Sequence, residues 1–291
     1  MILVTGATGT VGTELVARLL GVGARVRVGL RSPQKGAALV EQGAEVVAFD
    51  FAQPQTYGPA LAGVSKVFFL SPPSAFDSIL ETQFVAAMKA AQVQHVVKLS
   101  VWNADGRGYT FARWHRESEL LIEQAGIPFT HLRPSGFMQN FLQLAQSVTQ
   151  SGIIALPLAD AAVGYIDVRD IAAVAAQVLL FGDHAGRAYN LSGPEALSYG
   201  QIAQQLTELT GRPVQYINVP SDRYAATLAS YGVPAPIVAA ICDLYAYYAN
   251  GGSDAVSPHV AEILGRPASS VARFLREHKA AFTAPAAGEA R

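Results

Sequence analysis

The segment TGATGTVG, with glycines at positions 6, 9 and 12, constrains the fold of this chain more than any other feature. It follows the apolar run ILV directly and leads into the helix-like pattern VGTELVARLLG. In this place the first glycine permits a tight turn, the second lets a pyrophosphate approach the backbone, and the third lets the helix pack closely on a sheet. The spacing is GxxGxxG, not GxGxxG, and such a triple can also be only a tight turn. After a first strand it predicts a dinucleotide site. The residues predicted to bind the phosphates are Gly6, Thr8, Gly9, Thr10, Val11 and Gly12.

Apolar, strand-like runs alternate with helix-like segments along the first half of the chain. The runs are ILVTG, RVRVGLR, EVVAFD, KVFFLS, HVVKLS and FTHLRP. Each is short and apolar on both faces, which is typical of parallel strands covered by helices on either side. The sequence therefore predicts an α/β fold with a doubly wound (Rossmann) sheet of six parallel strands.

The alternation weakens after residue 134, where helical patterns such as DIAAVAAQVLL and YGQIAQQLTELTG mix with the short runs AYNLSG and VQYINV. No linker rich in Pro, Gly or Ser separates the two parts. We expect residues 1–150 to form an NAD(P)-binding domain and residues 151–282 a smaller, mostly helical region packed on it on the substrate side. Residues 283–291 are expected to be a flexible tail.

Charge and cysteine content limit the kinds of molecule that this chain is expected to bind. Charged residues make up 15% of the chain and the net charge is -1, so no positive field draws it to nucleic acid or an anionic membrane. The single cysteine, Cys242, has no disulfide partner and no neighbouring ligand cluster, so no metal site is predicted. No apolar run approaches the roughly 20 residues of a membrane-spanning helix, and the start MILV lacks a signal-peptide pattern. We expect a cytoplasmic protein with a small-molecule partner, and leave open whether it is a homodimer.

The end of the second strand indicates which dinucleotide binds. An acidic residue there would hold the ribose 2′-hydroxyl of NAD, but the sequence reads GLRSPQK. Arg31 takes that place, and Ser32 and Lys35 follow it. A guanidinium suits a 2′-phosphate, so NADPH is expected to be preferred over NADH. The alternative is that Arg31 is only a solvated side chain at a strand end.

Five motifs together resemble the NmrA-like group of atypical short-chain dehydrogenases/reductases, from residue 1 to about residue 280. They are TGATGTVG, EVVAFDF, FFLSPP, HRESELLIEQAGIPFTHLRPSGFMQNF and GYIDVRDIAAV. The group includes NAD(P)H:quinone oxidoreductases and triphenylmethane reductases. The motifs are specific for the group, but not for a substrate.

The resemblance implies further site residues, which the loops at the carboxyl edge of a parallel sheet would bring together. Those implied at the cofactor are Asp50, Phe51, Leu70, Ser71, Pro72, Ser100, Pro134, Ser135, Gly136 and Phe137. Those implied at the substrate are Phe76, Trp114, Met138, Asn140 and Tyr165. Phe51 and Phe137 can also be plain core aromatics, and Asp50 can cap the helix that follows. Asp167 and Asp170 are interpreted as structural carboxylates at a helix start.

Most members of this superfamily carry Tyr-x-x-x-Lys on the fifth helix, and in many of them a glutamate follows four residues after the lysine. If Glu119 is that glutamate, Phe111 and His115 stand at the tyrosine and lysine positions, and the catalytic pair is missing. Tyr109 and Arg113 have the right mutual spacing but lie two residues early, which turns them by about 200° around an α-helix. This rotation disfavours Tyr109 as the proton donor but leaves it as a candidate. His115 can relay a proton or bind a quinone oxygen, or it can be a polar residue on the helix surface.

Three function classes follow. The first is an NADPH-dependent reductase that transfers hydride to a quinone-like or other conjugated molecule without a Tyr-x-x-x-Lys pair. Its cofactor supplies the chemistry and the protein supplies orientation. The second is a non-catalytic NADP(H) sensor that binds a protein partner, as other NmrA-like members do. The third, a nucleotide-sugar epimerase or dehydratase, is disfavoured by the missing pair.

Overall fold

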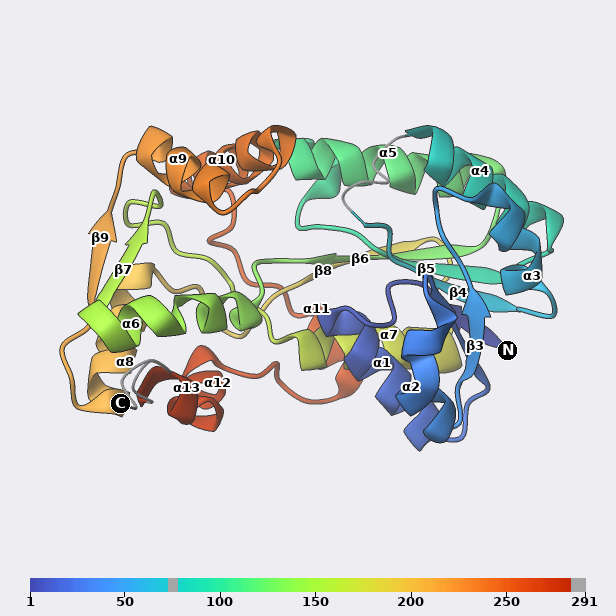
Figure 1. The fold of residues 1–291 in the computed structure, drawn as a ribbon, viewed down its shortest axis with the longest axis horizontal. Helices are drawn as coiled ribbons and strands as arrows, with labels where there is room; N and C mark the ends of the chain where they lie inside the picture. Colours follow the sequence, from blue (N-terminus) through green and yellow to red (C-terminus); the bar gives the residue numbers. More distant parts are fainter. Residues whose placement is uncertain (73–77, 284–291) are drawn as a thin grey trace.

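The computed structural model describes residues 1–72 and 78–283, and its main layer is a seven-stranded parallel sheet (Figure 1). The strand order is β3-β2-β1-β4-β5-β6-β8. The strands are β1 (Ile2–Val4), β2 (Val26–Leu30), β3 (Glu45–Ala48), β4 (Lys66–Phe69), β5 (His95–Leu99), β6 (Phe129–Pro134) and β8 (Arg187–Leu191). The order reverses direction after β3, with β4 added on the far side of β1. The predicted doubly wound sheet is confirmed.

The seventh strand, β8, corrects the expected number of six. It pairs in parallel with β6, with Thr130 opposite Arg187 and Leu132 opposite Tyr189. Its residues are exposed or half-buried except the last, as befits an edge strand. Because β8 is not apolar on both faces, the pattern that revealed the other strands does not place it in this sheet.

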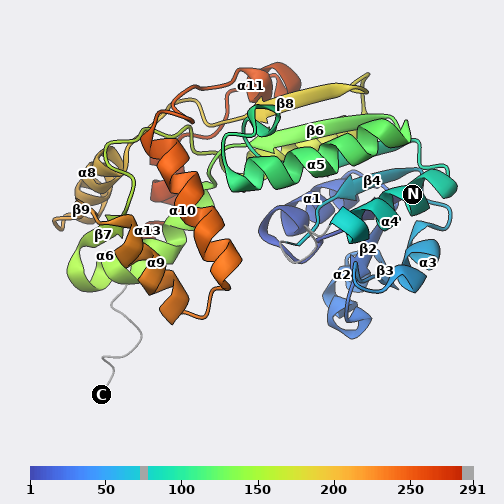
Figure 2. The same ribbon diagram turned by 90° about the horizontal axis from the view of Figure 1, so that it is seen from above.

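Helices cover both faces of the sheet (Figures 1 and 2). One face carries α1 (Thr10–Gly21), α2 (Ala37–Glu41), α7 (Val168–Leu180) and α11 (His259–Leu264). The other carries α3 (Tyr57–Leu61), α4 (Ser78–Ala90) and α5 (Thr110–Ala125). Short 3₁₀ turns lie at Pro33–Gly36, Pro54–Thr56, Ala104–Gly106 and Met138–Leu144. In the described part of the chain, no helix is long and apolar enough to cross a membrane.

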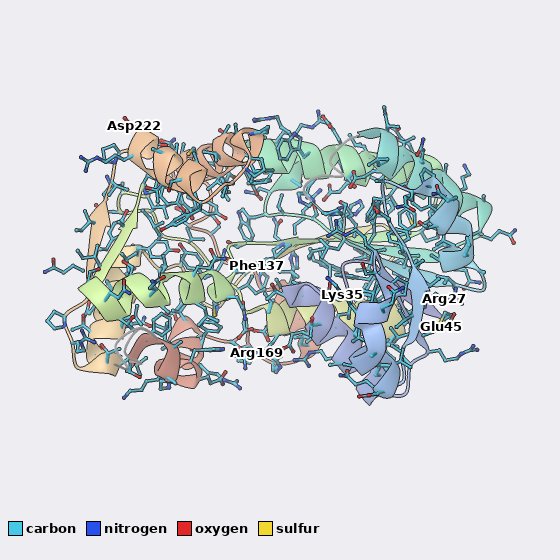
Figure 3. All side chains as sticks on the ribbon, in the orientation of Figure 1. Arg27, Lys35, Glu45, Phe137, Arg169 and Asp222 are labelled. Atoms are coloured by element: carbon cyan, nitrogen blue, oxygen red, sulfur yellow. The ribbon has the colours of Figure 1, made fainter. Side chains whose placement is uncertain are left out.

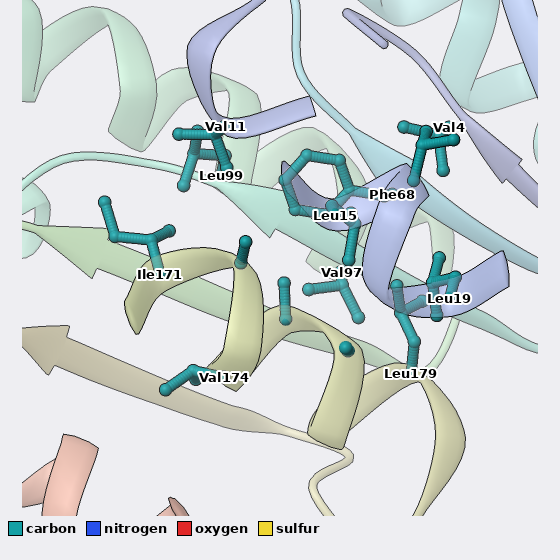
Figure 4. Close-up of a cluster of buried hydrophobic side chains, with 14 of the residues drawn as sticks. Val4, Val11, Leu15, Leu19, Phe68, Val97, Leu99, Ile171, Val174 and Leu179 are labelled. Atoms are coloured by element: carbon teal, nitrogen blue, oxygen red, sulfur yellow. The ribbon is translucent and has the colours of Figure 1, made fainter. Parts of the chain in front are cut away.

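Side chains of α1, α7 and the central strands fill the space between the sheet and these two helices (Figure 4). Leu15 and Leu19 of α1 are fully buried there, as are Val97 of β5 and Ile171 of α7. Burying one such side chain contributes about 1.5–3 kcal/mol. This packing fixes α1 against the sheet and with it the glycine turn at its start.

A second, smaller layer lies beside the carboxyl ends of the main strands (Figures 1 and 2). Its elements are α6 (Ala145–Ser151), β7 (Ile153–Leu156), α8 (Tyr199–Thr210), β9 (Gln215–Asn218), α9 (Ser221–Ser230), α10 (Ala235–Ala249), α12 (Val271–Glu277) and α13 (Lys279–Thr283). Strands β7 and β9 pair in parallel, and the layer has a hydrophobic core of its own.

The larger layer draws on both predicted regions, because α7 and β8 come from beyond residue 150. The division at that residue stays a prediction. Thr283 ends α13, and the rest of the predicted tail lies outside the described residues.

Candidate functional site

The three glycines of the turn between β1 and α1 differ in the space that each leaves for a side chain. Gly6 has φ +66°, and a Cβ there would lie 2.8 Å from the Leu70 side chain. A Cβ on Gly12 would lie 2.1 Å from the carbonyl oxygen of Gly6. Gly9, by contrast, would meet only that same oxygen, at 3.3 Å. The fold thus requires Gly6 and Gly12, while the bare backbone at Gly9 is open on the side where a ligand would approach.

The start of α1 is open to an anion. Gly9 is the N-cap residue and has no side chain to cap the helix, so the first-turn N–H groups lack the usual hydrogen-bond acceptor. Thr8, Gly9 and Thr10 are exposed, while Val11 is buried in the core. The helix dipole adds partial positive charge at this end. These features match what a pyrophosphate requires.

The end of β2 adds two cations. Arg31 and Lys35 are exposed, and neither pairs with a carboxylate in the described part of the chain. Figure 3 labels Lys35. Arg27 on the same strand differs, because it is almost buried and binds Glu45 at 2.7 Å and the carbonyl oxygen of Ala60 at 2.9 Å. Arg27 is structural, whereas Arg31 and Lys35 have their charges available for a ligand.

The end of β3 places two residues that were predicted at the adenine. Asp50 is half-buried, and its Oδ1 accepts the backbone N–H of Ala52 at 3.0 Å, a local capping contact. The ring of Phe51 is buried against Phe69 and Phe84, with centroids 5.9 and 5.4 Å apart. The ring is therefore a core aromatic, and the backbone carbonyl oxygen of Phe51 already accepts the Tyr57 hydroxyl at 2.6 Å.

The end of β4 carries Leu70, Ser71 and Pro72. Leu70 is half-buried and Pro72 is exposed. Ser71 is buried, and its hydroxyl donates to Oε1 of Glu81 on α4 at 2.5 Å. Leu70 and Pro72 are thus better placed than Ser71 to offer a side chain to a ligand.

Ser100, just after β5, belongs to a buried network. Its hydroxyl donates to Oε1 of Glu119 at 2.6 Å, and Arg133 binds both oxygens of the same carboxylate at 3.0 and 2.8 Å. Burial alone raises the pKa of Glu119, but the Arg133 hydrogen bonds, the nearby His131 and Arg133 charges and the Ser100 hydroxyl outweigh it and hold that pKa at about 2. Ser100 therefore fixes Glu119, and its hydroxyl is not free for a cofactor.

Sequence reasoning missed Lys98, the residue two positions earlier on β5. Its side chain is 0% exposed. The ammonium nitrogen lies 3.0 Å from the carbonyl oxygen of Leu99, 3.5 Å from Nδ1 of His115 and 4.8 Å from the ring centroid of Phe69. The available signal was a lone lysine inside the apolar strand HVVKLS. A strand lysine is normally solvated, so its burial is unusual.

His115 is 7% exposed, so the alternative of a polar residue on the helix surface is wrong. It lies on the α5 face that packs toward the sheet, together with Ser118 and Glu119. Burial, and then the Lys98 charge, hold the pKa of His115 well below its usual value. His115 is therefore a neutral imidazole at physiological pH.

Tyr109 and Arg113 do not form a relay. Helix α5 begins at Thr110, so Tyr109 is an extended N-cap residue and the rotation argument does not apply to it. Its buried hydroxyl donates to the carbonyl oxygen of Trp102 at 2.6 Å, and burial raises its pKa further. Arg113 instead binds Asp243 on α10, at 3.1 Å. The hydroxyl of Tyr109 is used within the fold, so the structure supports a structural role for this residue and not a catalytic one.

The turn after β6 lies at the junction of the two layers, and Phe137 is seen there in Figure 3. Pro134 and Ser135 are buried, while Gly136 and Phe137 are half-buried. The Ser135 hydroxyl lies 3.0 Å from that of Ser253, which approaches from the second layer. Phe137 is thus not a plain core aromatic, since part of its side chain remains accessible.

The residues predicted at the substrate differ in how far they are buried. Met138 and Tyr165 are buried in the core of the second layer, and their place at a substrate stays a prediction. Trp114 is half-buried and Asn140 is exposed. Phe76 lies outside the described residues.

Asp167 and Asp170 are structural carboxylates, as interpreted from the sequence. Asp167 caps α7 by accepting the backbone N–H of Arg169 at 2.9 Å. Asp170 accepts from Arg266 at 2.8 Å and from the backbone of Ser269 at 2.7 Å. These contacts tie α7 to the segment after α11.

Glu119, Glu123 and His131 bring possible metal ligands within 4.8 Å of one another. Arg116 bridges the two carboxylates at 3.0 and 2.5 Å, and Arg133 binds Glu119. Two guanidinium groups already neutralise this cluster, so it is a network of salt bridges with no charge left for a cation.

The geometry agrees with comparisons to known proteins. A model of the NmrA-like family matches residues 1–265. The chain belongs to the NmrA-like family. The resemblance drawn from its motifs is confirmed.

Similar proteins cover almost the whole chain. An NAD(P)H azoreductase of Xenophilus azovorans is 34% identical over 285 residues, 98% of this chain and 100% of the relative. A (4-alkanoyl-5-oxo-2,5-dihydrofuran-3-yl)methyl phosphate reductase of Streptomyces griseus is 36% identical, over 97% of this chain and 99% of its own.

Solved structures are similar over a comparable length. An NADPH-dependent quinone oxidoreductase from Escherichia coli, complexed with NADPH, has a TM-score of 0.88 at 28% identity, over 96% of this chain and 100% of its own. A Citrobacter sp. triphenylmethane reductase complexed with NADP(H) has a TM-score of 0.85 at 27% identity, over 95% and 99%.

Proposed function

We propose that this protein is an NADPH-dependent reductase that transfers hydride to a quinone-like or other conjugated small molecule. The observation that carries the proposal is the pairing of an open glycine turn with two unpaired cations at the neighbouring strand end. Gly9 and the uncapped start of α1 suit a pyrophosphate, and Arg31 with Lys35 suits a 2′-phosphate. Full-length similarity to oxidoreductases supports the same conclusion.

The reaction balances as quinone plus NADPH plus one proton giving hydroquinone plus NADP⁺. The bound nicotinamide supplies the hydride, which is two electrons and one proton. The backbone at Gly9 and the helix start would hold the phosphates, and Phe137 at the layer junction would offer an apolar surface to the acceptor. The protein contributes mainly proximity and orientation.

The contacts of α5 favour a route without a tyrosine acid. Phe111 has no hydroxyl, and the hydroxyl of Tyr109 is held by the carbonyl of Trp102. A quinone accepts hydride without prior protonation, so a neutral hydrogen-bond donor is enough to stabilise the developing oxyanion. His115, on the sheet-facing side of α5, is the candidate donor.

The test is oxidation of NADPH by a panel of acceptors containing several quinones, an azo dye and a triphenylmethane dye. We expect protein-dependent turnover with at least one acceptor and weaker turnover with NADH. A protein that binds NADPH tightly but oxidises it with none of them would instead be the sensor that the sequence left as an alternative.

A further inference from the structure

The buried contact between Lys98 and His115 has a chemical consequence for the imidazole. The ammonium nitrogen of Lys98 faces Nδ1 of His115 at 3.5 Å and donates to the carbonyl oxygen of Leu99 at 3.0 Å. A protonated lysine has only donors and no acceptor. In this contact Nδ1 must therefore accept, and the imidazole hydrogen lies on Nε2.

Two glutamates favour the protonated form of Lys98 against its burial. Burial, the largest influence, lowers the pKa of Lys98, and the charges of Glu81 on α4 and Glu119 on α5 reduce that lowering. The face of the Phe69 ring, 4.8 Å from the ammonium nitrogen, also favours a cation. In the described part of the chain no carboxylate lies within ion-pair distance of Lys98, so its hydrogens go to the carbonyl and the imidazole.

Two further features favour a role for this pair beyond packing. His115 stands on the sheet-facing side of α5, one and a half turns from the helix start. Lys98 lies two residues before Ser100, at the carboxyl edge of β5 where a parallel sheet binds its ligands. A buried lysine is costly unless its charge is used, and an apolar residue of similar size would fill the same space at less cost.

We propose that Lys98 is a positioning residue that fixes His115 in the neutral Nε2–H tautomer, so that His115 offers a hydrogen-bond donor to the acceptor atom that gains charge on hydride transfer. The role of the donor rests on the proposed function. The tautomer and its dependence on Lys98 do not.

The direct test is ¹⁵N NMR of histidine-labelled protein without any acceptor, with the His115 signals assigned from a His115→Gln variant. We expect the wild type to show the Nε2–H tautomer, unchanged across neutral pH. Lys98→Met should shift His115 toward a mixture of tautomers. Lys98→Arg keeps a cation that has only hydrogen-bond donors, so this variant should retain the Nε2–H tautomer. An Nδ1–H tautomer in the wild type, or no change in Lys98→Met, would overturn the proposal.

A matched control exists at the opposite end of the sheet. Lys66 donates to the carbonyl oxygen of Leu179, and its charge adds to burial in lowering the pKa of the neighbouring His95. Lys66→Met should therefore move the His95 signals and leave those of His115 in place. If Lys66→Met alters His115 as strongly as Lys98→Met does, the effect is a general loss of packing and the proposal fails.

Kinetics test the role of the donor. With an acceptor found in the panel, Lys98→Met should lower kcat about tenfold or more, since a wrong tautomer disables a positioned imidazole, while the KM for NADPH stays unchanged. His115→Phe should lose about 10²-fold, as expected for one missing donor. Unchanged kcat in Lys98→Met with an altered tautomer would refute the donor role. If the wild type reduces no acceptor, the proposed function fails and the NMR result still decides the positioning role.

Discussion

Single residues near the carboxyl edge of the sheet differ chiefly in whether their polar atoms are already used. The hydroxyls of Ser71, Ser100 and Tyr109 each donate to a buried oxygen within the protein. Arg31 and Lys35 have no such partner among the described residues and lie exposed. The first group supports the fold, and the second is available to a ligand.

We predict that Tyr109→Phe lowers stability but retains quinone-reductase activity. Removing the hydroxyl leaves the buried carbonyl of Trp102 without its hydrogen bond, at a cost of about 1–3 kcal/mol. Urea unfolding and kcat/KM should be measured together, with Tyr231→Phe as the control because Tyr231 is 80% exposed. A hundredfold loss of kcat/KM with intact NADPH affinity would make Tyr109 an acid after all.

We also predict that Arg31→Ala weakens NADPH binding selectively. A charge-assisted contact to the 2′-phosphate contributes about 1.5–3 kcal/mol, so calorimetry should show a loss of roughly 10- to 100-fold for NADPH and little change for NADH. Arg25, exposed at the other end of β2, supplies the control Arg25→Ala, which should bind both cofactors normally. An equal loss of both cofactors in Arg31→Ala would remove the basis for NADPH preference.

At the scale of elements, six strands and the glycine turn could be predicted because their patterns are local. Strand β8 could not be placed, since an edge strand whose residues are mostly exposed or half-buried carries no strong periodicity. The start of α5 was expected too early, because Tyr109 has helical spacing but extended dihedral angles. The burial of Lys98 and of the Tyr165 ring depends on helices distant in sequence, which one strand or loop does not reveal.

In the turn between β1 and α1, substitutions of Gly9 and Gly12 should have different effects. Gly9→Val should abolish NADPH binding in a folded protein, because the side chain would occupy the pyrophosphate approach while its Cβ makes one tight contact within the turn, 3.3 Å from the carbonyl oxygen of Gly6. Gly12→Val should instead impair folding, since its Cβ would lie 2.1 Å from a carbonyl oxygen. Titration with NADPH alongside circular dichroism separates the two. Normal binding by Gly9→Val would place the phosphates elsewhere.

At the scale of the whole molecule, buried histidines should make stability depend on pH. Burial lowers the pKa of His131 to about 4, although Glu119 and Glu123 act against it, while the unfolded chain titrates near 6.5. As the pH falls through this window the unfolded chain takes up a proton that the folded protein does not, so the free energy of unfolding falls. The loss from His131 is about 3 kcal/mol between pH 6.5 and pH 4.

His115 adds to this loss in the same direction, and Glu119 adds a further loss below about pH 4.5, since its pKa is also lowered. Urea midpoints at about pH 7.5 and about pH 5 provide the measurement. The His131→Gln variant should show a flatter dependence. A wild type equally stable at both pH values would contradict the assigned burial.

The two layers meet at the carboxyl edge of the sheet, where we propose that hydride passes to an acceptor. A single-turnover experiment tests this proposal. Protein loaded with one equivalent of NADPH is mixed with a quinone, and loss of reduced cofactor and appearance of hydroquinone are followed together. We predict one hydroquinone per NADPH, faster than without protein and slowed when the transferred hydrogen of NADPH is deuterium. Bound NADPH that persists in the presence of every acceptor tested would contradict the account.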